Sequence, residues 1–186
     1  MRHQDRTLRI IGGNWRGRKI TFPEHDGIRP TGDRVRETLF NWLMHDIRGA
    51  ACLDLFAGSG VLSIEALSRG AAHVTLIENN HAASSHISKN LALLDANPNT
   101  FDNIKSDAMN WLSHCDNGFD LIFIDPPFAS NALPRVLEHL AARQIARKFV
   151  YLETPEALEI GDLPDQWRLY RQKRTGSVHY SLCIIG

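Results

Sequence analysis

From residue 50 onward the chain alternates short apolar runs with amphipathic segments, and this alternation restricts its possible folds more than any other feature. ACLDLF (51–56), HVTLIE (73–78), FDLIFID (119–125) and KFVYLE (148–153) have the length and composition of buried strands, and FDNIK (101–105) is a weaker candidate. Helical patterns lie between these runs. Repeated strand–helix units build a mostly parallel sheet with helices on both faces. The sequence therefore predicts an α/β fold.

The two ends of the chain carry a different pattern. Residues 8–22, LRIIGGNWRGRKITF, predict a β-hairpin around a Gly-rich connection, and an amphipathic helix follows from Thr31 or Asp33. Near the other end, WRLYRQK and SVHYSLCII flank Thr175–Gly176 and predict a hairpin that adds an antiparallel strand to the sheet. We expect two parts, an N-terminal hairpin and helix in residues 1–45 and a ligand-binding domain in residues 46–186.

The formal net charge of zero conceals an asymmetry. Residues 1–36 contain nine Lys/Arg and four Asp/Glu, a balance of +5, whereas the remainder contains twelve and seventeen, a balance of −5. A basic segment attached to an acidic body suits a polyanionic partner, although a solvated surface would give the same count.

Four acidic residues end or follow the predicted strands, namely Asp54, Glu78, Asp107 and Asp125. Ligands of parallel sheets bind at the carboxyl ends of the strands, near the point where strand order reverses. Helix N-capping could account for Asp54 or Asp107 singly. As a set, the four acids predict a binding site at this edge.

The first strand leads into DLFAGSG (54–60), a glycine turn that opens a helix. Gly58 and Gly60 permit a tight turn and a close approach of the backbone to a ligand. The turn is similar to the dinucleotide fingerprint G-x-G-x-x-G, but Ser63 occupies the third glycine position, which disfavours a dinucleotide. Asp54 would repel a pyrophosphate and suits a ligand with an amine. Glu78, twenty residues after Gly58, could accept hydrogen bonds from ribose hydroxyls.

Over residues 50–186 this constellation resembles the class I S-adenosylmethionine-dependent methyltransferases. The resemblance implies a Rossmann-like, seven-stranded, mostly parallel sheet with an antiparallel C-terminal hairpin, and S-adenosyl-L-methionine as cofactor. It implies that Asp54 and the Gly58–Gly60 turn hold the methionine part, Glu78 the ribose, and Asp107 the adenine. The full set of implied cofactor contacts is Asp54, Phe56, Ala57, Gly58, Ser59, Gly60, Glu78, Asn79, Asp107 and Ala108, with Thr31 lining the pocket.

The stretch DPPF, residues Asp125, Pro126, Pro127 and Phe128, follows the fourth predicted strand. It is similar to the (D/N)PP(Y/F/W) motif of enzymes that methylate exocyclic or amide nitrogens. The lone pair of a base amine is delocalised into the ring. The Asp125 carboxylate and the Pro126 carbonyl could accept hydrogen bonds from such an amine and stabilise its developing positive charge. Two prolines would fix these acceptors, and Phe128 could stack on the extruded base.

RIIGGNWRGRKI (9–20) and RPTGDRVRETLFNWL (29–43) resemble segments of the bacterial 16S ribosomal RNA guanine-N2 methyltransferases of the RsmD type. Together with DLFAGSG, ALSRGA and DPPF, the resemblance spans nearly the whole chain. It implies methylation of the N2 amine of one guanine in 16S ribosomal RNA, within an assembled or assembling 30S particle that carries head ribosomal proteins.

An RNA substrate agrees with the basic N-terminus, since basic side chains contact phosphates and exposed rings stack on bases. The candidate RNA-binding residues are Arg9, Trp15, Arg16, Arg18, Lys19, Arg34 and Arg36. Trp15 could instead pack the hairpin onto the sheet. We expect Arg34 and Arg36 to lie opposite the apolar stripe of Val35, Leu39 and Trp42, where they could face RNA or the cofactor carboxylate.

Three other functions are compatible with parts of this pattern: a DNA adenine-N6 methyltransferase, a non-catalytic RNA-binding assembly factor, and a Rossmann dehydrogenase. We expect no metal, because the nine histidines are scattered. No apolar run reaches the length of a membrane span, and the first ten residues lack the apolar core of a secretory signal. The three cysteines show no CxxC pair and leave one unpaired in any disulfide scheme, which favours a reducing cytoplasm. We expect a monomer.

Overall fold

The computed structural model describes residues 6–22, 31–127 and 132–186. Its main element is a seven-stranded sheet with the strand order β5-β4-β3-β6-β7-β9-β8. The predicted α/β fold with a mostly parallel sheet is confirmed, because five strands pair in parallel and β9, at one end, pairs antiparallel with both β7 and β8. The strands are β3 (Ala51–Asp54), β4 (His73–Glu78), β5 (Phe101–Lys105), β6 (Phe119–Ile124), β7 (Ala146–Thr154), β8 (Trp167–Thr175) and β9 (Val178–Ile185).

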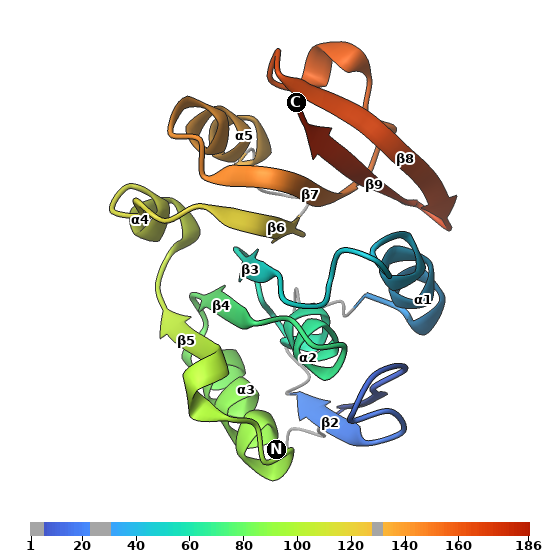
Figure 1. Ribbon diagram of the computed structural model, residues 1–186, viewed down its shortest axis with the longest axis vertical. Helices are drawn as coiled ribbons and strands as arrows, with labels where there is room; N and C mark the ends of the chain where they lie inside the picture. Colours follow the sequence, from blue (N-terminus) through green and yellow to red (C-terminus); the bar gives the residue numbers. More distant parts are fainter. Residues whose placement is uncertain (1–5, 23–30, 128–131) are drawn as a thin grey trace.

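Helices cover both faces of the sheet (Figure 1). One buried core joins the sheet to α1, α2 and α3, and a second joins it to α4 and α5. The helices are α1 (Asp33–Trp42), α2 (Val61–Ser68), α3 (His81–Leu93), α4 (Ala108–Leu112) and α5 (Leu133–Ala142), with 3₁₀ turns η1 (Pro98–Thr100) and η2 (Ile160–Asp162). The face that α1, α2 and α3 cover is called the α1 face below.

The predicted N-terminal hairpin is present as β1 (Arg6–Arg9) and β2 (Lys19–Phe22), which pair antiparallel. It rests on the α1 face, and Ile10 and Ile20 are buried in the same core as α1 and α2. Thr21 exchanges hydrogen bonds with Asn90 of α3 at 3.0 and 2.7 Å. The hairpin is therefore packed on the helices rather than held on a free stalk.

The loop between β1 and β2 is held against the end of α2 by Asn14 and Trp15. Their backbone amides donate to the carbonyl oxygen and the hydroxyl oxygen of Ser68, at 2.7 and 2.9 Å. A Cβ on Gly13, where φ is +73°, would lie 1.9 Å from the Ser68 carbonyl oxygen. Only glycine allows so close an approach at this φ.

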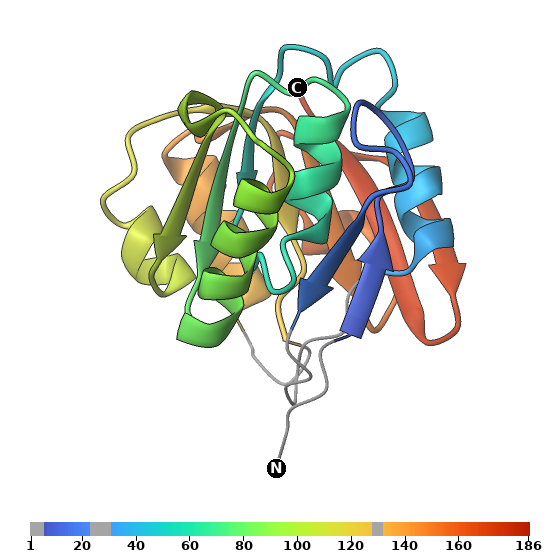
Figure 2. The ribbon, with the colours of Figure 1, turned by 90° about the horizontal axis from the view of Figure 1, so that it is seen from below.

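The parallel strands point to one edge of the sheet, which we call the carboxyl edge (Figure 2). Strand order reverses between β3 and β6, so a cleft is expected at this edge between the segments that follow these strands. Among the described residues, no helix is long and apolar enough to cross a membrane.

Candidate active site

Two of the predicted acids lie on neighbouring strands at the carboxyl edge. Asp54 is the last residue of β3, and Asp125 directly follows β6. These strands pair in parallel with Asp54 opposite Phe123, at the point where the strand order reverses. The fold thus brings together two carboxylates that are 71 residues apart in the sequence.

Asp54 is an interior carboxyl group, with 3% of its surface exposed. The Ser63 hydroxyl donates to its Oδ2 atom at 2.7 Å. Burial raises the pKa of Asp54 to about 7, and the hydrogen bond from Ser63 opposes that rise. Ser63 thereby has a structural reason to occupy the place of the third glycine.

The glycine turn after β3 is tied to the end of β4 through Glu78. Its Oε2 atom accepts from the Gly58 amide at 2.7 Å, and its Oε1 atom accepts from the Asn80 amide at 2.6 Å. Gly58 and Gly60 have φ angles of 53° and 74°. A Cβ on Gly60 would lie 2.8 Å from Cγ1 of Ile87. Both the positive φ angle and this close approach therefore favour glycine at position 60.

Asp125 and Pro126 begin the loop at the centre of the carboxyl edge. Asp125 is half-buried, Pro126 is buried and Pro127 is exposed. Burial raises the pKa of Asp125 well above its usual range, and the negative charges of Glu153 and Asp54 raise it further. Phe128 lies outside the described residues.

Glu153 is a further acid of this site that sequence reasoning missed. It lies near the end of β7, is 7% exposed, and accepts at Oε1 from the Thr31 hydroxyl and the Tyr151 hydroxyl, both at 2.8 Å. Burial raises the pKa of Glu153, against the two hydrogen bonds. The signal was in the sequence, because KFVYLE ends in an acid as the earlier strands do. The predicted pocket residue Thr31 is thereby placed beside Glu153, whose negative charge acts on Asp125.

The remaining candidate cofactor residues lie in the glycine turn and in the segments that follow β4 and β5. Asp107 is exposed and accepts from the Asn110 amide at 2.9 Å, so it caps α4, as the capping alternative predicted. Asn79 is exposed after β4, whereas Ser59 and Ala57 are buried in the glycine turn. Phe56 is half-buried and Ala108 is buried, both against the core on the α4 side.

The candidate RNA-binding residues of the hairpin lie on its surface. Arg9, Arg16, Arg18 and Lys19 are exposed, as is Arg34 on α1. The Arg18 guanidinium donates to the backbone carbonyls of Leu93 and Leu94, where a cation also complements the helix dipole at the end of α3. Trp15 is half-buried and packs against the core, as its structural alternative predicted.

The structure contradicts the role predicted for Arg36. Its side chain is 0% exposed and donates to the carbonyls of Thr31 and Arg9 and to the carboxylates of Glu65 and Asp33. Arg36 is separated by three and four positions from Leu39 and Phe40, both buried, so it lies on the covered side of α1 rather than opposite it. A side chain in this position cannot bind RNA or the cofactor, and it holds the hairpin onto α1 and α2.

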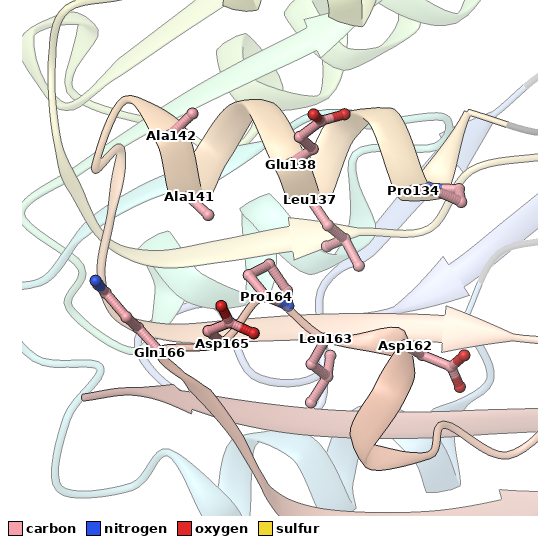
Figure 3. A pocket seen from close by; sticks show the side chains of 10 residues that line it. All are labelled: Pro134, Leu137, Glu138, Ala141, Ala142, Asp162, Leu163, Pro164, Asp165 and Gln166. Carbon is pink, nitrogen blue, oxygen red and sulfur yellow. The ribbon is translucent and has the colours of Figure 1, made fainter.

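A separate hollow of about 520 Å³ lies along α5 and the segment that leads into β8 (Figure 3). Pro134, Leu137, Leu163 and Pro164 form its apolar lining, and none of the predicted site residues borders it. Within the described part of the chain, no group of three His, Cys, Asp or Glu side chains could hold a metal ion.

Strand order, the glycine turn and the acids after β3, β4 and β6 together define a class I methyltransferase fold. A distant solved structure complexed with SAH shares this fold with a TM-score of 0.74 at 12% identity, over 91% of this chain and 54% of that chain. The chain belongs to the family described as Conserved hypothetical protein 95, whose profile matches residues 8–184.

Curated relatives in this family carry a shared name. "Ribosomal RNA small subunit methyltransferase D" of Escherichia coli is 45% identical over 94% of this chain and 88% of its own length. The protein of the same name from Haemophilus influenzae is 40% identical over 94% of this chain and 92% of its own length. The solved structure of the Escherichia coli protein yhhF superposes with a TM-score of 0.88 at 43% identity, covering 97% of this chain and 98% of that one. The predicted family resemblance is confirmed.

Proposed function

We propose that this protein transfers a methyl group from S-adenosyl-L-methionine to the exocyclic N2 amine of one guanine in the 16S ribosomal RNA of the small subunit. The names of the curated relatives, which match over nearly their whole length, support the ribosomal RNA substrate. The observation that carries the proposal is the convergence of Asp54, Asp125 and Glu153 at the ends of adjacent strands.

The residues at the carboxyl edge fit the cofactor chemically. S-adenosylmethionine supplies a methyl group on a positively charged sulfonium, and it carries an amine and two ribose hydroxyls. Burial raises the pKa of Asp54 and Asp125, and neighbouring negative charges raise it further, so a cationic group among them would stabilise their ionised forms. Asp54 and the Gly58–Gly60 turn would hold the methionine part, Glu78 the ribose, and Asp107 the adenine.

The DPPF loop would bind the acceptor amine. The Asp125 carboxylate and the Pro126 carbonyl would accept hydrogen bonds from this amine. These bonds would hold its nitrogen lone pair toward the reacting methyl group. Thr31 and Tyr151 fix Glu153, whose charge acts on Asp125. Phe128 would stack on the extruded guanine, which favours a partly unstacked RNA site.

The chain would divide the work between its two parts. Residues 1–45 form an RNA-binding extension, with phosphate contacts from Arg9, Arg16, Arg18, Lys19 and Arg34. Residues 46–186 bind the cofactor and the target base. The substrate is 16S ribosomal RNA in an assembled or assembling 30S particle, and the protein acts as a monomer in the cytoplasm, where these particles form.

Mass analysis of ribosomal RNA nucleosides tests the proposed function. A strain that lacks the gene should lose one N2-methylguanosine from 16S RNA, and the purified protein should restore it on 30S particles from that strain. Methyl transfer to adenine in duplex DNA would instead support the DNA alternative. Binding of RNA without transfer to any nucleoside would support the assembly-factor alternative.

A further inference from the structure

Strand β8 carries a basic group that the charge balance of the whole chain conceals. Within Trp167–Thr175 the sequence places Arg168, Arg171, Lys173 and Arg174, all exposed, on the edge strand of the main sheet. None of these four forms an ion pair with another described residue. They lie at the opposite end of the sheet from β5 and α3, beside which the N-terminal hairpin packs.

The register places one end of β8 at the carboxyl edge. Lys173 pairs with Tyr180 of β9, and Tyr180 pairs with Glu153 of β7. Two strand spacings separate the backbones of Lys173 and Glu153, which is about 10 Å. The turn between β8 and β9 consequently lies at the same edge as the acids of the site (Figure 2).

A bulge in β8 gathers cationic side chains on the α1 face. Leu169 pairs with Cys183 and Arg171 with Leu182, so Tyr170 is the extra residue. Arg171 and Lys173 lie opposite Leu182 and Tyr180, and both partners belong to the core under α1. Without the bulge, alternation would send Arg171 and Lys173 to the other face.

Tyr170 adds an aromatic ring to this group. It is 49% exposed, its ring centroid lies 6.3 Å from that of Phe149 on the α1 face, and the Arg171 guanidinium lies 4.8 Å from its centroid. Arg174 differs, because it pairs opposite His179 on the other face and donates to the carbonyl of Gly176 at 2.8 Å. The β8 basic surface is therefore defined as Tyr170, Arg171 and Lys173.

We propose that the β8 basic surface is a second RNA-contact surface that binds backbone phosphates of the RNA substrate, across the site from the N-terminal hairpin. This inference rests on the proposed function. Arg171 and Lys173 form no ion pair with the residues that the structure describes, so their positive charges are available to attract the phosphates of a polyanionic partner. Exposed tyrosine next to arginine provides a stacking position that suits unpaired bases. Protection of an edge strand from self-association is the competing explanation, because lysine and arginine also serve that purpose.

Charge reversal separates the two explanations. The test uses the full chain, 30S particles that lack the methyl group, and binding measured from 50 to 200 mM salt. The double variant R171E/K173E should bind at least about tenfold more weakly, with a log–log salt slope that is smaller by about 1.4 for two lost phosphate contacts. R168E is the matched control, because Arg168 lies on the same strand and face but about 14 Å from Lys173, toward the opposite edge. We expect R168E to bind within about twofold of the wild type.

Two further measurements complete the design. The neutral variant R171Q/K173Q should show about half of the loss in log affinity, and cofactor titration should give unchanged affinity in every variant, since none of these residues lies among the candidate cofactor contacts. Glutamate keeps the edge charged, so the edge-protection explanation predicts that R171E/K173E binds as R168E does, and this result would overturn the inference alone. A wild-type protein that neither binds nor methylates the particles would overturn the proposed function as well.

Discussion

Ser63 donates a hydrogen bond of 2.7 Å to Asp54 from the position at which a dinucleotide-binding turn carries its third glycine. The hydroxyl is 0% exposed and stabilises an acid that is itself buried. The buried Asp54 carboxyl thus lies at the start of the glycine turn, where it disfavours a pyrophosphate and suits a ligand with a positive charge.

Replacing Ser63 with alanine removes this donor, and the buried Asp54 carboxyl then has one hydrogen bond fewer. We expect Ser63→Ala to lower the free energy of unfolding by about 1–3 kcal/mol, the usual cost of removing one partner of a buried hydrogen bond. Urea denaturation measures it. Ser113→Ala, on an exposed serine after α4, should stay within about 0.5 kcal/mol of the wild type. Equal effects of the two substitutions would contradict a special role for Ser63.

The raised pKa of Asp54 predicts how stability depends on pH in the absence of cofactor. The folded state favours the protonated acid, so this contribution is complete below the ordinary pKa of 3.8 and is lost as the pH rises through about 7. In Asp54→Asn the loss is absent. The stability of the wild type relative to Asp54→Asn should therefore fall between pH 4 and 7, by up to about 1.4 kcal/mol per pH unit. A difference that stays constant with pH would show that Asp54 ionises normally.

Glu153 is predicted to shift the pH dependence of methyl transfer through Asp125. Its negative charge contributes to the raised pKa of Asp125, so Glu153→Gln should lower that pKa. If transfer requires ionised Asp125, the acid limb of the rate profile moves to lower pH in this variant. Glu156→Gln, at an exposed position just after β7, should leave the limb in place. An acid limb that stays in place in Glu153→Gln would show that Glu153 does not influence methyl transfer through the pKa of Asp125.

Glu65 is predicted to hold the N-terminal hairpin on the domain. This buried carboxylate accepts from the Ile11 amide at 3.0 Å, from Arg36 at 3.2 Å and from Arg69 at 3.0 Å. Glu65→Ala leaves Arg36 buried with less compensation and should destabilise the protein by about 3–5 kcal/mol. Thermal and urea unfolding measure this loss. Exposed Glu138 on α5 provides the control, and Glu138→Ala should cost no more than about 0.5 kcal/mol.

Strong periodicity made most of the fold predictable from the sequence. Ala83, Ile87, Leu91 and Leu94 repeat at helical spacing, and all four are buried, the first three in α3 and Leu94 at its C-cap. Helix α4 escaped prediction because its five residues are too few to show a periodic pattern. The hairpin was predicted, but β1 begins at Arg6, two residues before the apolar run that marked it.

The acids of the site could be predicted from their positions at the ends of individual strands, whereas the residues that hydrogen-bond to them could not. Asp54 and Asp125 could be placed because strand ends converge in a parallel sheet. The contact between Thr31 and Glu153 joins residues 122 positions apart, and no local pattern encodes such a pair. Arg36 was misplaced because a charged residue was assigned to the solvent, although its spacing to Leu39 and Phe40 indicated the buried side of α1.

Asp125 provides the most direct test of the account, by comparing methyl transfer with binding in one variant. On 30S particles that lack the methyl group, Asp125→Ala should reduce the rate of N2-methylguanosine formation at least about 100-fold, because an acceptor aimed at the developing charge is lost. Its affinities for the cofactor and for the particle should each stay within about threefold of the wild type. Transfer by Asp125→Ala at close to the wild-type rate, with the same nucleoside as product, would contradict the central claim.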